Sequence, residues 1–121
     1  MIIIQYGNKL QLQHDMLECN PGCSIVVHNA YVIEEGRRMR EFKIVERDFE
    51  FRESNILDEL GQFSPTASYF FKKDVLDVLP SWFCSAPVGD LLIELYSQKI
   101  GFGLYLEGKY SVYRYMSFGS W

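Results

Sequence analysis

An aspartate at the start of a predicted helix is the clearest candidate for acid–base chemistry in this sequence. Asp90 follows Ala86-Pro87-Val88-Gly89 and precedes the apolar run Leu91-Leu92-Ile93. A carboxylate on such a turn can take a proton from a substrate as a general base. It can equally cap the helix and interact favourably with the helix dipole. Capping hydrogen bonds favour the charged carboxylate and lower its proton affinity. A capped aspartate can still act as a base, so the sequence leaves both roles open.

Two adjacent polar residues, His28 and Asn29, interrupt an otherwise apolar segment that predicts a strand. Buried polar side chains need hydrogen-bond partners, since an unpaired polar group costs free energy on burial. The spacing favours a pair that is satisfied internally and fixes the register of the strand. The functional alternative is that one of the two side chains reaches a cleft at the end of the strand.

Four potential metal ligands also lie close together in the sequence, namely His14, Cys19, Cys23 and His28. Their H-x4-C-x3-C-x4-H spacing matches no common structural zinc motif. The first histidine falls on a predicted helix and the second within a predicted strand, so the four side chains are poorly placed to meet at one ion. We therefore assign no metal ligands and expect both cysteines to be small packing residues, with a small zinc protein as the weakest alternative.

The composition bounds the class of protein. The chain has 121 residues, 48% of them hydrophobic, with a formal net charge of -4. This length predicts a single domain over 1–121, and the charge offers no basic face for nucleic acid. No apolar stretch is long enough to predict a transmembrane segment. The three cysteines argue against a disulfide framework, so we expect a reduced, cytoplasmic protein.

The pattern of apolar residues, turn residues and caps predicts a mixed α/β domain. A helix begins at Asn8, presents Leu10, His14 and Leu17 as one stripe, and stops before Asn20-Pro21-Gly22. The next segment, 24–33, is apolar on both faces, which predicts a central strand covered on both sides. The further predicted elements are a charged strand through Phe42 and Ile44 as far as Phe51, a helix over 53–60, a strand over 67–71, a helical turn over 74–79, a helix over 90–98 and a hairpin of 101–106 with 109–115.

Several segments, taken in order, resemble the C-terminal part of bacterial family 2 glycosyltransferases. The segments that carry the resemblance are Asn8-Lys9-Leu10-Gln11, His28-Asn29-Ala30, Ser64-Pro65-Thr66-Ala67-Ser68-Tyr69-Phe70-Phe71, Leu79-Pro80-Ser81-Trp82-Phe83, Ala86-Pro87-Val88-Gly89-Asp90, Lys99-Ile100-Gly101 and Tyr113-Arg114, with Ser117-Phe118-Gly119-Ser120-Trp121 at the end. The resemblance implies part of a nucleotide-diphospho-sugar transferase-like fold, with a mixed sheet, hairpins and flanking helices. It also implies sugar transfer from a nucleotide-sugar donor to a glycan acceptor with inversion.

The same resemblance assigns roles to individual residues. Asp90 matches the position of the base, Thr66 and Ser68 match the loop and strand near the acceptor, and Tyr113 and Arg114 match a segment that closes over the site. The family often has a histidine two positions after this arginine, where the present sequence has Met116, a poor ligand for a hard cation.

The sequence has no Gly-rich phosphate loop and no D-x-D pair, and it begins where the D-x-D motif of the family has just ended. The resemblance therefore implies an acceptor-side half without the donor-binding half, inactive in isolation. A divalent metal, Mn²⁺ or Mg²⁺, is expected only for a full-length enzyme. The alternative is a non-catalytic module that binds a glycan or a protein. Half of a two-part fold should expose apolar surface, so we also expect a homodimer.

Overall fold

The computed structural model describes residues 2–5, 8–34, 39–59, 63–86 and 89–115. Six strands, four α-helices and two short 3₁₀ helices make up this part of the chain. In chain order they are β1 (Ile2–Gln5), α1 (Lys9–Cys19), β2 (Cys23–Glu34), β3 (Met39–Glu41), β4 (Phe49–Phe51), α2 (Glu53–Leu57), η1 (Thr66–Ser68), β5 (Phe70–Phe71), α3 (Asp74–Val78), η2 (Phe83–Ser85), α4 (Gly89–Ser97) and β6 (Phe102–Tyr115).

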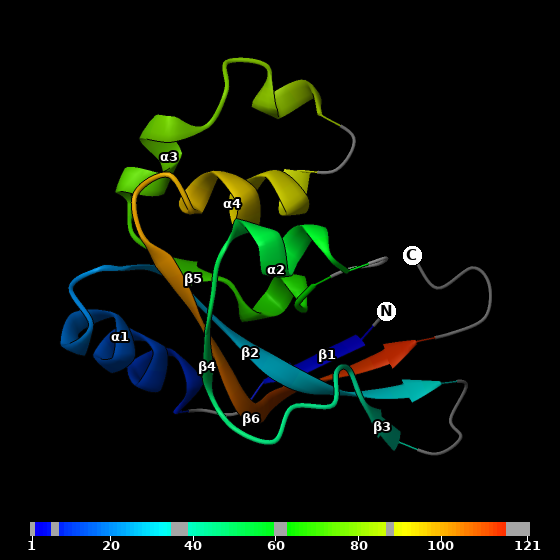
Figure 1. Ribbon diagram of the computed structural model, residues 1–121. Helices are drawn as coiled ribbons and strands as arrows, with labels where there is room; N and C mark the ends of the chain where they lie inside the picture. The colour runs from blue at the N-terminus through cyan, green and yellow to red at the C-terminus, as the bar shows by residue number, and fades with distance from the viewer. Residues whose placement is uncertain (1, 6–7, 35–38, 60–62, 87–88, 116–121) are drawn as a thin grey trace.

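Two long strands, β2 and β6, form the parallel centre of a curled sheet (Figure 1). Shorter strands pair antiparallel with their outer edges: β3 and β5 with β2, and β1 and β4 with β6. The predicted mixed sheet with flanking helices is therefore confirmed. Ile2–Gln5 was not predicted as a strand, although its pairing with β6 makes it part of this sheet.

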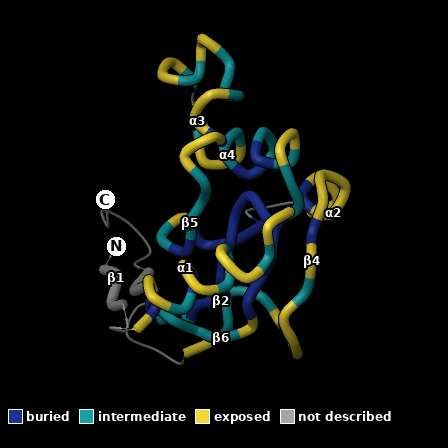
Figure 2. The backbone as a smooth tube through the Cα atoms, turned by 90° about the vertical axis from the view of Figure 1, so that its left-hand side faces the viewer, coloured by how far each residue is buried: buried dark blue, intermediate teal, exposed yellow. Residues whose placement is uncertain are grey.

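Helices cover both faces of β2, as its two apolar faces predicted. Ile25 and Val27 belong to a core cluster that receives side chains from α2 and α4. Val26 belongs to a second cluster, which Leu12 and Met16 of α1 pack against. Figure 2 shows the result as a buried central backbone with exposed segments around it.

Of the apolar stripe predicted for α1, only Leu17 packs against the core. Leu10 is 59% exposed, whereas Lys9 and Gln13 are the buried residues of this helix. The ammonium of Lys9 donates to the carbonyl of Ala67, and Gln13 Nε2 donates to the carbonyls of Val26 and Ser68. Long polar side chains thus share the inner face of α1 with apolar ones, because main-chain carbonyls lie beneath part of it.

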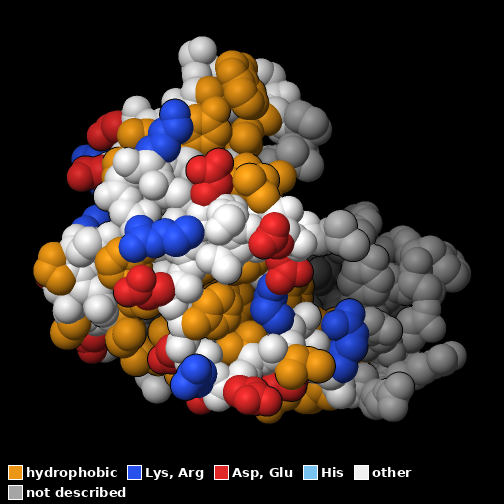
Figure 3. All heavy atoms as spheres, viewed as in Figure 1, with side chains coloured by type: hydrophobic (Ala, Val, Ile, Leu, Met, Phe, Trp, Pro, Cys, Tyr) orange, Lys and Arg blue, Asp and Glu red, His pale blue; other side chains and the backbone are white. Residues whose placement is uncertain are grey.

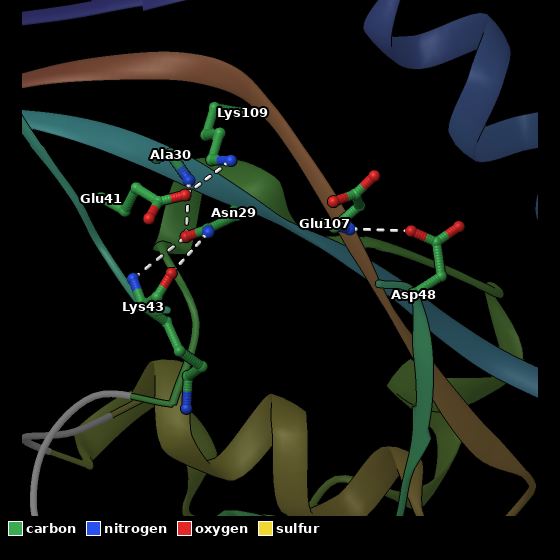
Figure 4. A network of polar contacts seen from close by, with 7 residues as sticks. All are labelled: Asn29, Ala30, Glu41, Lys43, Asp48, Glu107 and Lys109. Carbon is green, nitrogen blue, oxygen red and sulfur yellow. Dashed lines mark hydrogen bonds and ion pairs between the residues drawn. The ribbon is translucent and has the colours of Figure 1, made fainter. Parts of the chain in front are cut away.

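The predicted hairpin around Glu107-Gly108 is also wrong, since β6 is one continuous strand. Its parallel pairing with β2 runs past this dipeptide, with a shift in register between His28 and Asn29. The main-chain N–H of Glu107 donates to Asp48 Oδ1 at 2.8 Å (Figure 4). The dipeptide Glu107-Gly108 therefore forms a bulge in β6, and the side chain of Asp48 accepts a hydrogen bond from its main chain.

The predicted strand through Phe42 and Ile44 is replaced by two short strands on opposite edges of the sheet. β3 pairs with β2, and β4 pairs with β6. The intervening chain must cross from one edge to the other, so it cannot continue either ladder. The predicted helix over 53–60 is confirmed as the shorter α2.

The α3–η2 segment projects from the rest of the fold (Figure 1). Leu76 and Trp82 in this segment are 53% and 54% exposed, and hydrophobic side chains gather there in Figure 3. None of the helices in the described part of the chain has the length and apolar composition that crossing a membrane requires.

Candidate functional site

The structure brings Asp90 and Thr66 into contact, although they are 24 positions apart in the sequence. Thr66 Oγ1 donates a hydrogen bond to Asp90 Oδ2 at 2.7 Å. Thr66 opens η1, and Asp90 lies in the first turn of α4. Both residues are exposed. The carboxylate is therefore held by a neighbouring loop at a helix N-terminus, where the dipole favours negative charge.

A second carboxyl group lies one helical turn further along α4. Glu94 is only 1% exposed, and its Oε1 accepts a hydrogen bond from the Tyr69 hydroxyl. The same hydroxyl lies 3.2 Å from the main-chain carbonyl oxygen of Asp90. Residues four apart on a helix share a face, so α4 presents one exposed and one buried carboxyl group toward the η1 loop.

Burial raises the pKa of Glu94 to about 7, and the negative charge of Asp90 raises it as well. The Tyr69 hydrogen bond, the charge of Lys43 and the nearby Ser64 hydroxyl lower it in part. Burial also raises the pKa of Tyr69, as do the charge and hydrogen bond of Glu94. The buried pair is therefore Tyr69 as a neutral phenol and Glu94 as a carboxyl group that changes charge near neutral pH.

Lys43 supplies the positive charge in this region. Its ammonium forms an ion pair with the carboxylate of Glu59 and lies 4.4 Å from the centroid of the Phe63 ring. The lysine side chain is 18% exposed. Because Glu59 already pairs with it, Lys43 moderates the charge of Glu94 from a distance and does not neutralise it.

Two buried oxygen atoms beside this pair, Ser64 Oγ and Glu94 Oε2, have no hydrogen-bond partner among the described residues. Ser64 is itself fully buried. Buried polar atoms are nearly always paired in folded proteins, and a catalytic role is one of several explanations for an exception. The arrangement can accept hydrogen bonds and can hold or release a proton at Glu94.

Ser68, predicted beside the acceptor, lies inside the fold. It is fully buried, and its hydroxyl donates to the carbonyl of Pro65 at 2.6 Å. Its own carbonyl accepts a hydrogen bond from Gln13. Ser68 therefore holds the η1 turn that carries Thr66.

The backbone of Tyr113 and Arg114 lies within β6, opposite Ile3 and Ile2 of β1. Their side chains lie outside the described part of the structure, as does Met116 as a whole. Their role at the site stays a prediction.

Asn29 has the internal partners expected of a buried polar residue. Its Nδ2 donates to the carbonyl of Lys43 at 2.6 Å, and its Oδ1 accepts from the N–H groups of Ala30 and Lys43 (Figure 4). These bonds attach residues 42–48, the crossing segment between β3 and β4, to β2 where the regular ladder with β3 has ended. Asn29 thus fixes the path of the chain, which favours the structural interpretation of this residue.

His28 is also fully buried, with its ring edge-on to Tyr110 at a centroid distance of 5.5 Å. Its Nδ1 lies 2.6 Å from the carbonyl oxygen of Asn29, and a carbonyl only accepts, so this contact places a proton on Nδ1. Nε2 has no partner among the residues that the structure describes. Burial lowers the pKa of His28 to about 4.

The four residues weighed as zinc ligands are divided between surface and core. His14 and Cys19 are exposed on α1, whereas Cys23 and His28 are buried in β2. Across the described ranges, no three histidine, cysteine, aspartate or glutamate side chains are grouped so that they could hold a metal ion.

The pKa shifts of Glu94 and His28 predict opposite dependences of stability on pH. The folded pKa of Glu94 lies above its ordinary value, so stability falls as pH rises from 4.5 to about 7. The folded pKa of His28 lies below its ordinary value, so stability is lost as pH falls from 6.5 to about 4. The two effects largely cancel between pH 4.5 and 6.5.

Substituting either residue should remove this compensation. Across that range, Glu94→Gln should lose stability on acidification relative to the parent chain, by about 1 kcal/mol per pH unit. His28→Phe should gain stability relative to the parent by a similar amount over the same change. Urea unfolding of the three proteins from pH 4.5 to 7.5 measures both slopes. Parallel curves for all three would contradict the assignments of both buried groups.

No protein-family model matches this sequence, and no curated protein matches it. The resemblance assigned no role at the site to Glu94, Tyr69 or Lys43. The sequence offered one signal for Glu94, which follows Asp90 by four positions on a predicted helix and therefore shares a face with it. No comparable spacing connects Tyr69 or Lys43 to α4 in the sequence.

Proposed function

We propose that this chain is the acceptor-binding part of an inverting nucleotide-sugar glycosyltransferase, with Asp90 as the base. The observation that supports the proposal best is the hydrogen bond between Thr66 and Asp90. Both residues resemble positions of the acceptor site in family 2 glycosyltransferases, and they lie in separate segments of the sequence.

The chemistry follows from an exposed, oriented carboxylate. In inverting transfer by single displacement, the acceptor oxygen bonds to the anomeric carbon of the donor as the bond to the nucleoside diphosphate breaks and the diphosphate leaves. A base must accept the proton of the acceptor hydroxyl in this step. Thr66 donates to one oxygen of Asp90, and a carboxylate has about four lone-pair directions, so the group can accept a further hydrogen bond from a sugar hydroxyl.

Saccharide binding is the direct test of this proposal. Titration of the ¹⁵N-labelled chain with neutral mono- and disaccharides should shift the amide signals of Thr66 and Asp90. Thr66→Val and Asp90→Asn should each raise the dissociation constant by about 10-fold. The first removes the hydrogen bond that orients Asp90, and the second alters the group that accepts from the sugar hydroxyl. Asp74→Asn is the matched control, since Asp74 is also an exposed aspartate in the first turn of a helix.

The outcomes separate the two candidate functions. Binding that depends on Asp90 and Thr66 but not on Asp74 supports the acceptor site. Binding that survives Asp90→Asn unchanged favours the non-catalytic glycan-binding module. If no saccharide shifts any amide signal at millimolar concentration, the acceptor role is wrong.

A further inference from the structure

The Tyr69 hydroxyl lies between two acceptors and has one proton to give. It contacts Oε1 of Glu94 and the main-chain carbonyl oxygen of Asp90, the latter at 3.2 Å. A single O–H can donate one well-aligned hydrogen bond at a time. The direction of this proton therefore depends on which acceptor is stronger.

The charge of Glu94 decides that competition. An ionised carboxylate accepts a charge-assisted hydrogen bond, which is stronger than a bond to a neutral carbonyl, so it takes the Tyr69 proton. A protonated Glu94 carries its own O–H and can donate to the Tyr69 oxygen. The Tyr69 proton is then free to turn toward the carbonyl of Asp90.

From this geometry we infer that Glu94 is a positioning residue for Asp90, acting through Tyr69. Protonation of Glu94 adds a hydrogen bond from the Tyr69 hydroxyl to the Asp90 carbonyl, and ionisation of Glu94 withdraws it. This inference rests on the proposed function for its meaning, because it concerns the turn that carries the proposed base. The hydrogen-bond exchange itself can be measured without any substrate.

The groups facing Glu94 allow both of its forms near neutral pH. Asp90 lies one turn before it on α4, Tyr69 and Ser64 face it from the segment around η1, and Lys43 faces it from the crossing segment. Burial and Asp90 raise the pKa of Glu94 to about 7, against the smaller lowering by the other three groups. Small changes in pH, or in the charge of Asp90, therefore shift the population of the two states.

The coupling between the carboxyl groups is reciprocal. The negative charge of Asp90 raises the pKa of Glu94. If Asp90 gains a proton, for example from an acceptor hydroxyl, the proton affinity of Glu94 must fall by the same coupling. Withdrawal of the Tyr69 hydrogen bond from the Asp90 carbonyl would then accompany proton uptake by Asp90.

Carbon-detected NMR can follow both ends of this exchange. In the parent chain, the side-chain carboxyl carbon of Glu94 should titrate with a midpoint near pH 7. The carbonyl carbon of Asp90, observed through the amide of Leu91, should shift with the same midpoint. Tyr69→Phe should abolish the Asp90 carbonyl shift while Glu94 still titrates.

Two further variants, with Asp74→Asn as a control, keep the test decisive if Tyr69→Phe fails to fold. Asp90→Asn should lower the Glu94 midpoint, whereas Asp74→Asn should leave it unchanged. Glu94→Gln should remove the shift of the Asp90 carbonyl near pH 7. An Asp90 carbonyl signal that does not follow Glu94, or that follows it equally in Tyr69→Phe, would overturn the inference.

The same samples distinguish failure of this inference from failure of the proposed function. If saccharides bind and the Asp90 carbonyl does not follow Glu94, the acceptor site stands and the positioning role is wrong. If no saccharide binds at any pH while the carbonyl follows Glu94, the exchange stands and the acceptor role is wrong. If both hold, the dissociation constant should change through the Glu94 midpoint, and Glu94→Gln should flatten that pH profile.

Discussion

Replacing Asn29 by alanine should lower the free energy of unfolding by about 4 kcal/mol. The substitution removes three hydrogen bonds to the main chain, from the N–H groups of Ala30 and Lys43 and to the carbonyl of Lys43. Each buried main-chain group left without a partner costs about 1–3 kcal/mol, and a cavity at a fully buried position adds to the loss. Urea unfolding of the parent and variant proteins measures the difference.

Asn55→Ala is the matched control for this prediction. Asn55 is exposed, and its Oδ1 accepts one hydrogen bond, from the N–H of Arg52 at 2.8 Å. Its removal should cost about 1 kcal/mol, as for other residues at helix N-termini. Equal losses in the two variants would show that Asn29 does not hold the crossing segment on β2.

Gly103→Ala is expected to destabilise the protein by about 3 kcal/mol. Gly103 lies directly opposite Phe51 in the pairing of β4 with β6. A Cβ atom at this position would lie 2.2 Å from the Cζ atom of the Phe51 ring. The ring is fully buried and packs against Phe63 at a centroid distance of 4.8 Å, so it cannot move aside without disturbing the core.

A double-mutant cycle separates this steric effect from other causes. In a Phe51→Leu background, Gly103→Ala should cost clearly less than in the parent chain, because the smaller side chain leaves room for the methyl group. Gly89→Ala is the control, since its Cβ would meet Phe83 at an ordinary distance of 3.6 Å and it begins α4. That control should be neutral or slightly stabilising. Additive effects at 51 and 103 would contradict the proposed clash.

The elements that the sequence predicted well are those with a strong local signal. β2 is apolar on both faces, and α1 ends where Asn20-Pro21-Gly22 begins. The hairpin around Glu107-Gly108 was mispredicted because a bulge and a turn use the same residue types. Only the distant partner strand β2 distinguishes the two, and its parallel pairing with β6 leaves no local trace.

The candidate site was predictable only in part, for the same reason. Resemblance placed Asp90 and Thr66 in one site, and the structure brings them into contact. The environment that raises the pKa of Glu94 depends on burial beneath a loop from another segment. Spacing along α4 puts Glu94 on the same face as Asp90, but it cannot show that Tyr69 and Ser64 close over that face.

The pairing of β2 with β6 determines when this chain can fold. The Ser24 hydroxyl donates to the carbonyl of Phe102, which lies 78 positions later in the sequence. During synthesis, β2 therefore leaves the ribosome long before its central partner exists. Contacts between such distant segments slow folding, because the loop between them must close before they form. Until β6 is made, the edge of β2 that faces β6 stays unpaired, so the nascent chain is most vulnerable to aggregation, and most in need of chaperones, in that interval.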